Sequence, residues 1–131
     1  MDRPRHILIV DDNGGIRMLL GAALEERGDR VTSAASGRSM RDLLKLDRVD
    51  AVVLDIRMPG ESGHSLALHA KELRLPVVLI SGSDEEIEFA KRHGYSCFAN
   101  HFACRSFSPR WMRHWRAAFT ARETPRVQSD V

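Results

Sequence analysis

The chain has 131 residues, with 20 Lys or Arg against 18 Asp or Glu, so its formal charge is only +2, and such a balance requires neither nucleic acid nor an anionic membrane as a partner. The length predicts one domain with a single sizeable core. No apolar run approaches the roughly 18 residues of a membrane span, the first run is too short for a signal peptide, and Cys97 and Cys104 lack CxxC spacing, so we expect a soluble, cytoplasmic protein with reduced cysteines.

The first third of the chain alternates between strand and helix signals. Residues 7–10 form a continuous apolar run, which is typical of a strand buried on both faces. Helical spacing then extends to Gly28, which predicts the C-terminal stop, and its apolar positions are Ile16, Leu19, Leu20, Ala23 and Leu24. Residues 31–34 predict a short second strand, and Met40, Leu43 and Leu44 predict a second helix that Ser36 would cap.

The middle of the chain contains two further apolar runs. Residues 51–54 predict a third strand that leads into Asp55. Residues 58–60 are Met-Pro-Gly and predict a turn, because proline fixes φ and glycine tolerates positive φ. The next helix is expected to carry Leu66, Ala70 and Leu73 inward. A fourth strand at 77–80 leads into Ser81.

The last third begins with a helix signal at residues 83–86, which have the S-x-x-E form of a capping box, and Gly94 predicts the stop of that helix. Residues 97–99 predict a weak fifth strand. Ser108 is expected to cap a final helix, whose apolar face comprises Trp111, Met112, Trp115, Ala118 and Phe119. Residues 123–131 are expected to form a disordered tail.

Five strands alternating with five helices predict an α/β fold with a doubly wound parallel sheet and no domain boundary within residues 1–122. In such sheets, chemistry collects outside the carboxyl ends of the strands. Asp11 and Asp12 follow the first strand, Asp55 the third and Ser81 the fourth. We therefore expect three carboxylates and one hydroxyl to converge.

Carboxylates gathered at one point raise each other's pKa unless a cation neutralises them, and Mg²⁺ prefers oxygen ligands. Asp12 and Asp55 would bind the ion directly, and Asp11 directly or through water. An aspartate beside Mg²⁺ can accept a phosphoryl group as an acyl phosphate, and Ser81 would hydrogen-bond a phosphoryl oxygen.

These residues resemble the receiver domains of bacterial two-component response regulators over roughly residues 5–121. The resemblance rests on three motifs in order, which are Asp11-Asp12, Asp55-Ile56-Arg57-Met58-Pro59-Gly60 followed by Gly63, and Ser81-Gly82. It implies a flavodoxin-like fold with strand order 2-1-3-4-5 and a cytoplasmic role in phosphorelay signalling. A sensor histidine kinase or a phosphotransfer protein would donate the phosphoryl group.

The resemblance also assigns roles to individual residues. Asp55 would be the phosphoacceptor, Asp11 and Asp12 the acidic pocket, the Arg57 backbone carbonyl a third Mg²⁺ ligand, and Ser81 the switch hydroxyl. A receiver of this kind would catalyse its own phosphorylation and dephosphorylation without being a conventional enzyme. The length leaves room for a stand-alone receiver, whose output would be a contact with another protein.

One part of the family pattern is missing after the fifth strand, where receivers usually carry a lysine followed by proline and an aromatic residue. Here the sequence is Ala99-Asn100-His101-Phe102, and no lysine lies beyond Lys91. Asn100 and His101 are the candidate replacements, since Arg105 would require a longer connection. Three carboxylates with Mg²⁺ and no ammonium leave the site at −1, which disfavours the phosphorylated state without abolishing it.

Several alternatives stay open beside this interpretation. Without the lysine, the domain would act as a phosphorylation-independent pseudo-receiver that binds a protein or dimerises. An aspartyl phosphatase of the haloacid-dehalogenase type would need an acid where Arg57 stands, and a dinucleotide-binding protein would need the absent GxGxxG motif. The aromatic residues of the last helix are core or a homodimer surface, and its arginines indicate a solvated face rather than a nucleic-acid site.

Overall fold

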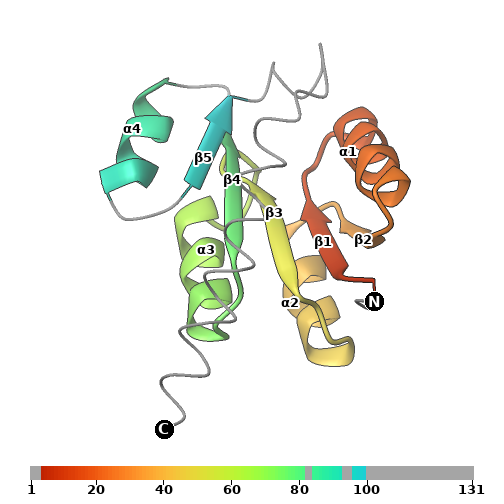
Figure 1. The fold of residues 1–131 in the computed structure, drawn as a ribbon. Coiled ribbons are helices and arrows are strands. Elements are labelled where there is room, and N and C mark those ends of the chain that lie inside the picture. The colour runs from red at the N-terminus through yellow and green to blue at the C-terminus, as the bar shows by residue number, and fades with distance from the viewer. Residues whose placement is uncertain (1–3, 82–83, 93–95, 100–131) are drawn as a thin grey trace, which may run out of the picture.

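The computed structural model describes residues 4–81, 84–92 and 96–99, and Figure 1 shows how their helices and strands are arranged. The strands form one parallel sheet in the order β2-β1-β3-β4-β5. Their bounds are β1 His6–Val10, β2 Arg30–Ala34, β3 Ala51–Asp55, β4 Val77–Ser81 and β5 Ser96–Ala99. The predicted α/β class and the order 2-1-3-4 of the first four strands are confirmed. The final helix expected from Ser108 lies outside the described residues, so the count of five helices stays a prediction.

Four helices connect these strands, with bounds α1 Gly14–Glu26, α2 Gly37–Leu46, α3 Gly63–Glu72 and α4 Asp84–Arg92. Three of the four begin after a polar N-cap whose side chain accepts backbone N–H groups of the first turn, and these caps are Asn13, Ser36 and Ser62. Gly28 follows α1 with a φ of 97°, as expected for a C-terminal stop. None of the helices in this described part is long and apolar enough to cross a lipid bilayer.

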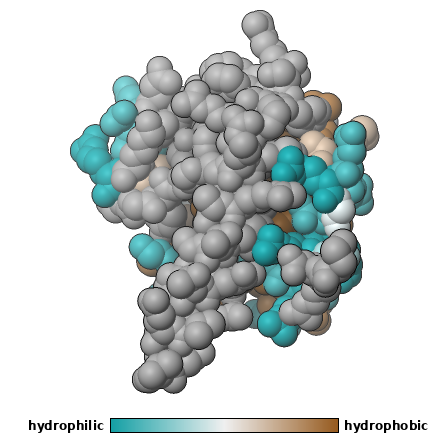
Figure 2. All heavy atoms as spheres, in the orientation of Figure 1, coloured by the Kyte–Doolittle hydropathy of each residue, from teal (hydrophilic) through white to brown (hydrophobic). Residues whose placement is uncertain are grey.

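The core consists of two apolar clusters, one on each side of the sheet. Ile7 and Ile9 of β1 point into the cluster covered by α1, whereas Leu8 and Val10 point into the cluster that contains residues of α2, α3 and α4. Every residue of β1 and β3 is buried for this reason, which explains why these strands are continuous apolar runs. Figure 2 shows mainly hydrophilic side chains on the outer surface of α4.

Two residues of the expected helical apolar patterns lie outside the core, and the first is Leu19 of α1, which is 38% exposed. Leu66 and Ala70 of α3 are completely buried, but Leu73 is 47% exposed. The helix ends at Glu72, and Leu73 serves as its C-cap, where its N–H donates to the carbonyl oxygens of His69 and Ala70. The apolar pattern of α3 therefore extends one residue beyond the end of the helix.

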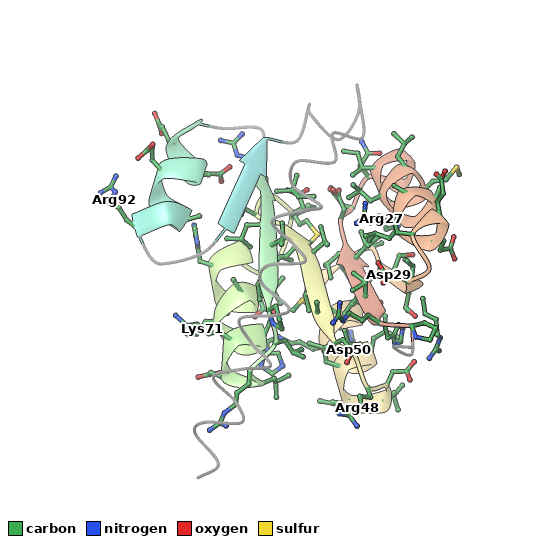
Figure 3. All side chains as sticks on the ribbon, in the orientation of Figure 1. Arg27, Asp29, Arg48, Asp50, Lys71 and Arg92 are labelled. Atoms are coloured by element: carbon green, nitrogen blue, oxygen red, sulfur yellow. The ribbon has the colours of Figure 1, made fainter. Side chains whose placement is uncertain are left out.

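A buried histidine forms several hydrogen bonds at the amino end of the sheet. The ring nitrogens of His6 lie 2.8 Å from the Arg48 carbonyl oxygen and 2.7 Å from the Thr32 hydroxyl oxygen. The His6 backbone N–H also donates to Asp50 Oδ2 at 2.8 Å, and the Asp50 N–H donates to the His6 carbonyl oxygen at 2.7 Å. Figure 3 shows Arg48 and Asp50 near the start of β1. These contacts connect β1 to β2 and to the loop before β3.

Candidate metal centre

Three carboxylates meet at the carboxyl end of the sheet. Asp11 and Asp12 follow β1, and Asp55 ends β3, whose residue Leu54 pairs with Val10. One carboxylate oxygen from each aspartate lies within 4.8 Å of the others. Asp11 and Asp55 are only 2% and 5% exposed, whereas Asp12 is exposed. The predicted convergence of the three acids is confirmed, and one side of the cluster is open to solvent.

Short backbone turns hold the two buried carboxylates in the same way. The Asn13 N–H donates to Asp11 Oδ1 at 2.9 Å, and the Arg57 N–H donates to Asp55 Oδ1 at 3.0 Å. Both contacts join residues i and i+2, a local pattern that aspartate favours where a regular element ends. Arg17 of α1 adds a third contact, because its Nη1 donates to the Asp11 carbonyl oxygen at 2.6 Å. Asp11 and Asp55 are therefore each held in place by hydrogen bonds from nearby residues of the chain.

The donor set fits a hard divalent cation. Asp11 Oδ2 is buried and, within the described residues, has no hydrogen-bond partner. A buried carboxylate oxygen without a partner is unfavourable, and a cation that it coordinates would remove that cost. All three side chains of the cluster offer carboxylate oxygens, which are the type of ligand that Mg²⁺ prefers, and the exposed side leaves room for water molecules of the ion. Asp11, Asp12 and Asp55 would hold such an ion.

The cluster has unusual electrostatics in the absence of a cation. Burial raises the pKa of the Asp55 carboxyl from 3.8 to about 7, and the charges of Asp11 and Asp12 add to this increase while the Arg57 N–H opposes it. Burial also raises the pKa of Asp11, against the opposing hydrogen bond from Asn13. The three carboxylates are thus poorly suited to being ionised together, and a bound cation would favour the fully ionised form.

The loop after Asp55 is shaped by glycine. Gly60 has a φ of 94°, which the predicted turn requires. Gly63 begins α3 directly against the backbone of Ile56, the residue that follows Asp55. This close approach fixes the start of α3 beside the strand end that carries Asp55.

The same loop is tied to α2 by an ion pair. Arg41 of α2 donates to both carboxylate oxygens of Glu61, with Nε to Oε1 at 2.9 Å and Nη2 to Oε2. Ser65 Oγ also donates to Glu61 Oε2 at 3.0 Å. The paired guanidinium lowers the pKa of Glu61. We call this group the α2 tether, which comprises Arg41, Glu61 and Ser65.

On its other side, the loop contacts α4 through a second ion pair. Arg57 Nε lies 3.1 Å from Glu86 Oε1, and the two side chains are 68% and 22% exposed. Sequence reasoning considered Arg57 only for its backbone carbonyl, and it also missed the N–H of Asn13 and the side chain of Arg17. The position of Asn13 ahead of a helical pattern is an N-cap signal that points to the first turn, but no local signal predicts the contact of Arg57 with Glu86.

The other predicted site residues are placed only in part. Ser81 ends β4, the neighbour of β3, and the Ile56 N–H donates to the Ile80 carbonyl oxygen at 3.0 Å. The backbone of Ser81 therefore lies at the same edge as Asp55, although its side chain is outside the described part. Asn100 and His101, the candidate lysine replacements, lie outside the described residues, as does Arg105.

The chain belongs to the response regulator receiver domain family, which matches residues 7–112. The transcriptional regulatory protein AfsQ1 of Streptomyces coelicolor is 32% identical over 83 residues, or 63% of this chain and 37% of AfsQ1. The alkaline phosphatase synthesis transcriptional regulatory protein PhoP of Bacillus subtilis is 32% identical over 108 residues, or 81% of this chain and 44% of PhoP. The chain thus spans about two fifths of the length of these curated relatives.

Solved structures agree with this family. NtrX from Brucella abortus is 27% identical with a TM-score of 0.82, and the match covers 97% of this chain and 29% of NtrX. The response regulator protein TrrA from Thermotoga maritima is 25% identical with a TM-score of 0.72, covers 88% of this chain and 98% of its own, and was solved in complex with Mg(2+)-BeF.

Proposed function

We propose that this receiver domain accepts a phosphoryl group on Asp55 in the presence of Mg²⁺ and signals through contacts with other proteins. The observation that carries the proposal is the position of Asp55, which is buried, bonded to the Arg57 N–H, and within 4.8 Å of carboxylate oxygens of Asp11 and Asp12. A sensor histidine kinase or a phosphotransfer protein would be the donor, as expected for a member of this family.

The proposed reaction transfers a phosphoryl group from a phosphohistidine to a carboxylate. An Asp55 oxygen attacks the phosphorus atom and forms a P–O bond while the P–N bond breaks, and the leaving imidazole nitrogen keeps the electron pair and takes up a proton. Mg²⁺ would neutralise charge on the transferred group. The protein's own contribution is to hold Asp55 through the Arg57 N–H and to keep Asp11 and Asp12 beside it.

Several finer assignments belong to the same proposal. The Arg57 carbonyl would be a further Mg²⁺ ligand, Ser81 would bond a phosphoryl oxygen, and Asn100 or His101 would occupy the lysine position. The receiver would comprise residues 1–122, and the domain would also react with small phosphodonors and hydrolyse its own acyl phosphate. A homodimer and a protein target stay predictions. The absence of a nucleic-acid partner also stays a prediction, because the relatives AfsQ1 and PhoP are transcriptional regulatory proteins.

A second candidate is a pseudo-receiver that binds its partner without phosphorylation. The observation that favours it is the lack of any lysine beyond Lys91, where receivers usually place one. In this case the acidic cluster would be a structural remnant, and the surface of the domain would carry the function.

One experiment separates the two candidates. The purified protein is incubated with Mg²⁺ and acetyl phosphate or phosphoramidate, and its intact mass is compared with that of Asp55→Asn. A single phosphoryl adduct that is absent from Asp55→Asn supports the phosphoacceptor. No adduct with either donor at several pH values supports the pseudo-receiver.

A further inference from the structure

We propose that the Arg57 guanidinium is a two-position cation, which pairs with Glu86 of α4 while Asp55 is unmodified and moves onto the phosphoryl group when Asp55 carries one. The inference rests on the proposed function, since it requires a phosphoryl group at Asp55. It gives this chain a phosphoryl-binding cation in place of the missing lysine, and it links the reaction to α4 through a single side chain.

The position of Arg57 allows both contacts. Its backbone N–H is bonded to Asp55 Oδ1 at 3.0 Å, so the base of the side chain is fixed beside the phosphoacceptor. Its Nε lies 3.1 Å from Glu86 Oε1, in the helix that follows β4. Since β3 and β4 are neighbours that end at the same edge, the ion pair joins the loop after β3 to the helix after β4.

The charge of the site creates the need for such a cation. Three carboxylates and one Mg²⁺ sum to −1, and phosphorylation of Asp55 changes the sum to about −2, because an acyl phosphate with close to two negative charges replaces a carboxylate with one. No lysine beyond Lys91 is available to offset them. A guanidinium can donate two parallel hydrogen bonds to phosphoryl oxygens, which is a stronger arrangement than one contact with a carboxylate.

Two other arginines, one bonded to Asp11 and one to the loop after Asp55, already have partners. Arg17 is half-buried and donates to the Asp11 carbonyl oxygen at 2.6 Å. Arg41 is paired through two nitrogens with Glu61. Arg57 differs from both, because its side chain is 68% exposed and its ion pair is formed with a residue of α4.

The exchange should be favourable once Asp55 is phosphorylated. An exposed ion pair biases an equilibrium by only about two- to fivefold, whereas the modified site attracts the guanidinium with more negative charge at a more buried position. When Arg57 moves, α4 loses its ion pair with the loop that carries the phosphoacceptor. By linkage, any partner that binds α4 and favours the separated pair also favours the phosphorylated state.

The test measures the lifetime of the phosphoryl adduct by intact mass after the donor is removed. Arg57→Gln should shorten the lifetime by about three- to tenfold. This is the effect expected from the loss of one charge-assisted contact that partial exposure to solvent weakens. Arg57→Lys keeps the charge but not the two parallel hydrogen bonds, so it should restore the lifetime only in part. Glu86→Gln removes the competing partner and should lengthen the lifetime by up to about fivefold, and it should have no effect when combined with Arg57→Gln.

The opposite signs of the Arg57 and Glu86 variants distinguish this proposal from a purely structural ion pair, which would give both variants the same sign. The matched control is Arg41→Gln, which breaks the α2 tether of the same loop. This variant should leave the lifetime within about twofold, because the partly exposed ion pair of Arg41 with Glu61 does not involve the phosphoryl group in this proposal. Unfolding midpoints of each variant verify that it is folded.

The outcomes separate the two proposals. If the unaltered protein forms no adduct, the proposed function fails and this inference fails with it. If an adduct forms but the Arg57 and Glu86 variants change its lifetime in the same direction, or not at all, the two-position cation alone is overturned. The same holds if Arg41→Gln shortens the lifetime as much as Arg57→Gln does.

Discussion

Gly63 lies so close to Ile56 that a Cβ at position 63 would stand 2.4 Å from the Ile56 carbonyl oxygen and 2.6 Å from its Cα. These atoms are backbone, so they cannot move aside as a flexible side chain would. The start of α3 is therefore in contact with Ile56, the residue directly after the proposed phosphoacceptor. Only glycine fits at position 63, where this contact is made.

Gly63→Ala is expected to destabilise the domain by about 2–3 kcal/mol, because the added methyl group must displace backbone. Urea unfolding measures the change. Gly21→Ala in α1 is the matched control, since its Cβ would lie 3.6 Å from Val31 Cγ1, an ordinary contact. That control should be neutral or stabilising by up to about 1 kcal/mol. Equal losses in both variants would contradict the argument from Gly63.

The stability of the domain without divalent cations should fall as pH rises from about 4 to about 7. The pKa of Asp55 is about 7 in the folded protein and 3.8 as its ordinary value, so within this window the folded state keeps a proton that the unfolded state releases. The change should be a few kcal/mol, since one pKa unit corresponds to about 1.4 kcal/mol. The raised pKa of Asp11 acts in the same direction.

Comparison with Asp55→Asn isolates this effect, because the other titrating groups are shared. The variant should be the more stable protein at pH 8 and should lose much of the pH dependence in urea unfolding with a chelator present. If the free energy of unfolding of the variant depends on pH between 4 and 7 as steeply as that of the unaltered protein, the Asp55 carboxyl is not the source of the pH dependence.

Addition of Mg²⁺ at pH 8 should stabilise the protein. A cation at ten times its dissociation constant raises the free energy of unfolding by about 1.4 kcal/mol, which thermal unfolding detects. Asp11→Asn should abolish most of this gain, because Asp11 Oδ2 is the buried oxygen without a partner in the described part. Asp42→Asn, an exposed acid on α2, should keep the full response, and an equal loss there would indicate non-specific binding.

Replacement of the missing lysine should increase phosphorylation. A charge-assisted hydrogen bond is worth about 1.5–3 kcal/mol, or roughly ten- to a hundredfold in an equilibrium, so Asn100→Lys or His101→Lys should raise the yield or lifetime of the adduct. Intact mass after treatment with acetyl phosphate measures both quantities. No gain from either variant would mean that neither residue occupies the lysine position.

Much of the architecture could be predicted because its signals are local. The apolar runs of β1, β3 and β4 are continuous, since both faces of the sheet are covered, and each run leads into a polar residue of the site. Parallel pairing then requires Asp11 and Asp55 to meet. The convergence of the acids followed from the order of these signals along the chain.

The contacts that surround the site could not be predicted in this way. The two ion pairs join residues far apart in the sequence, Arg57 with Glu86 at 29 positions and Arg41 with Glu61 at 20 positions. They depend on how the helices pack against the sheet. The raised pKa of Asp55 depends on its burial, which is a tertiary property. The error at Leu73 has a local cause, because α3 ends one residue earlier than its apolar pattern suggests.

The division of the core into two clusters has a consequence for how this domain can be altered. Among the described residues, the clusters share no buried member, and the sheet separates them. A designer could repack the α1 side, for example around Ile16 and Leu20, and leave the packing beneath α3 and α4 intact. The two sides of the sheet could then be altered separately, with the aspartates at its carboxyl end as the point common to both.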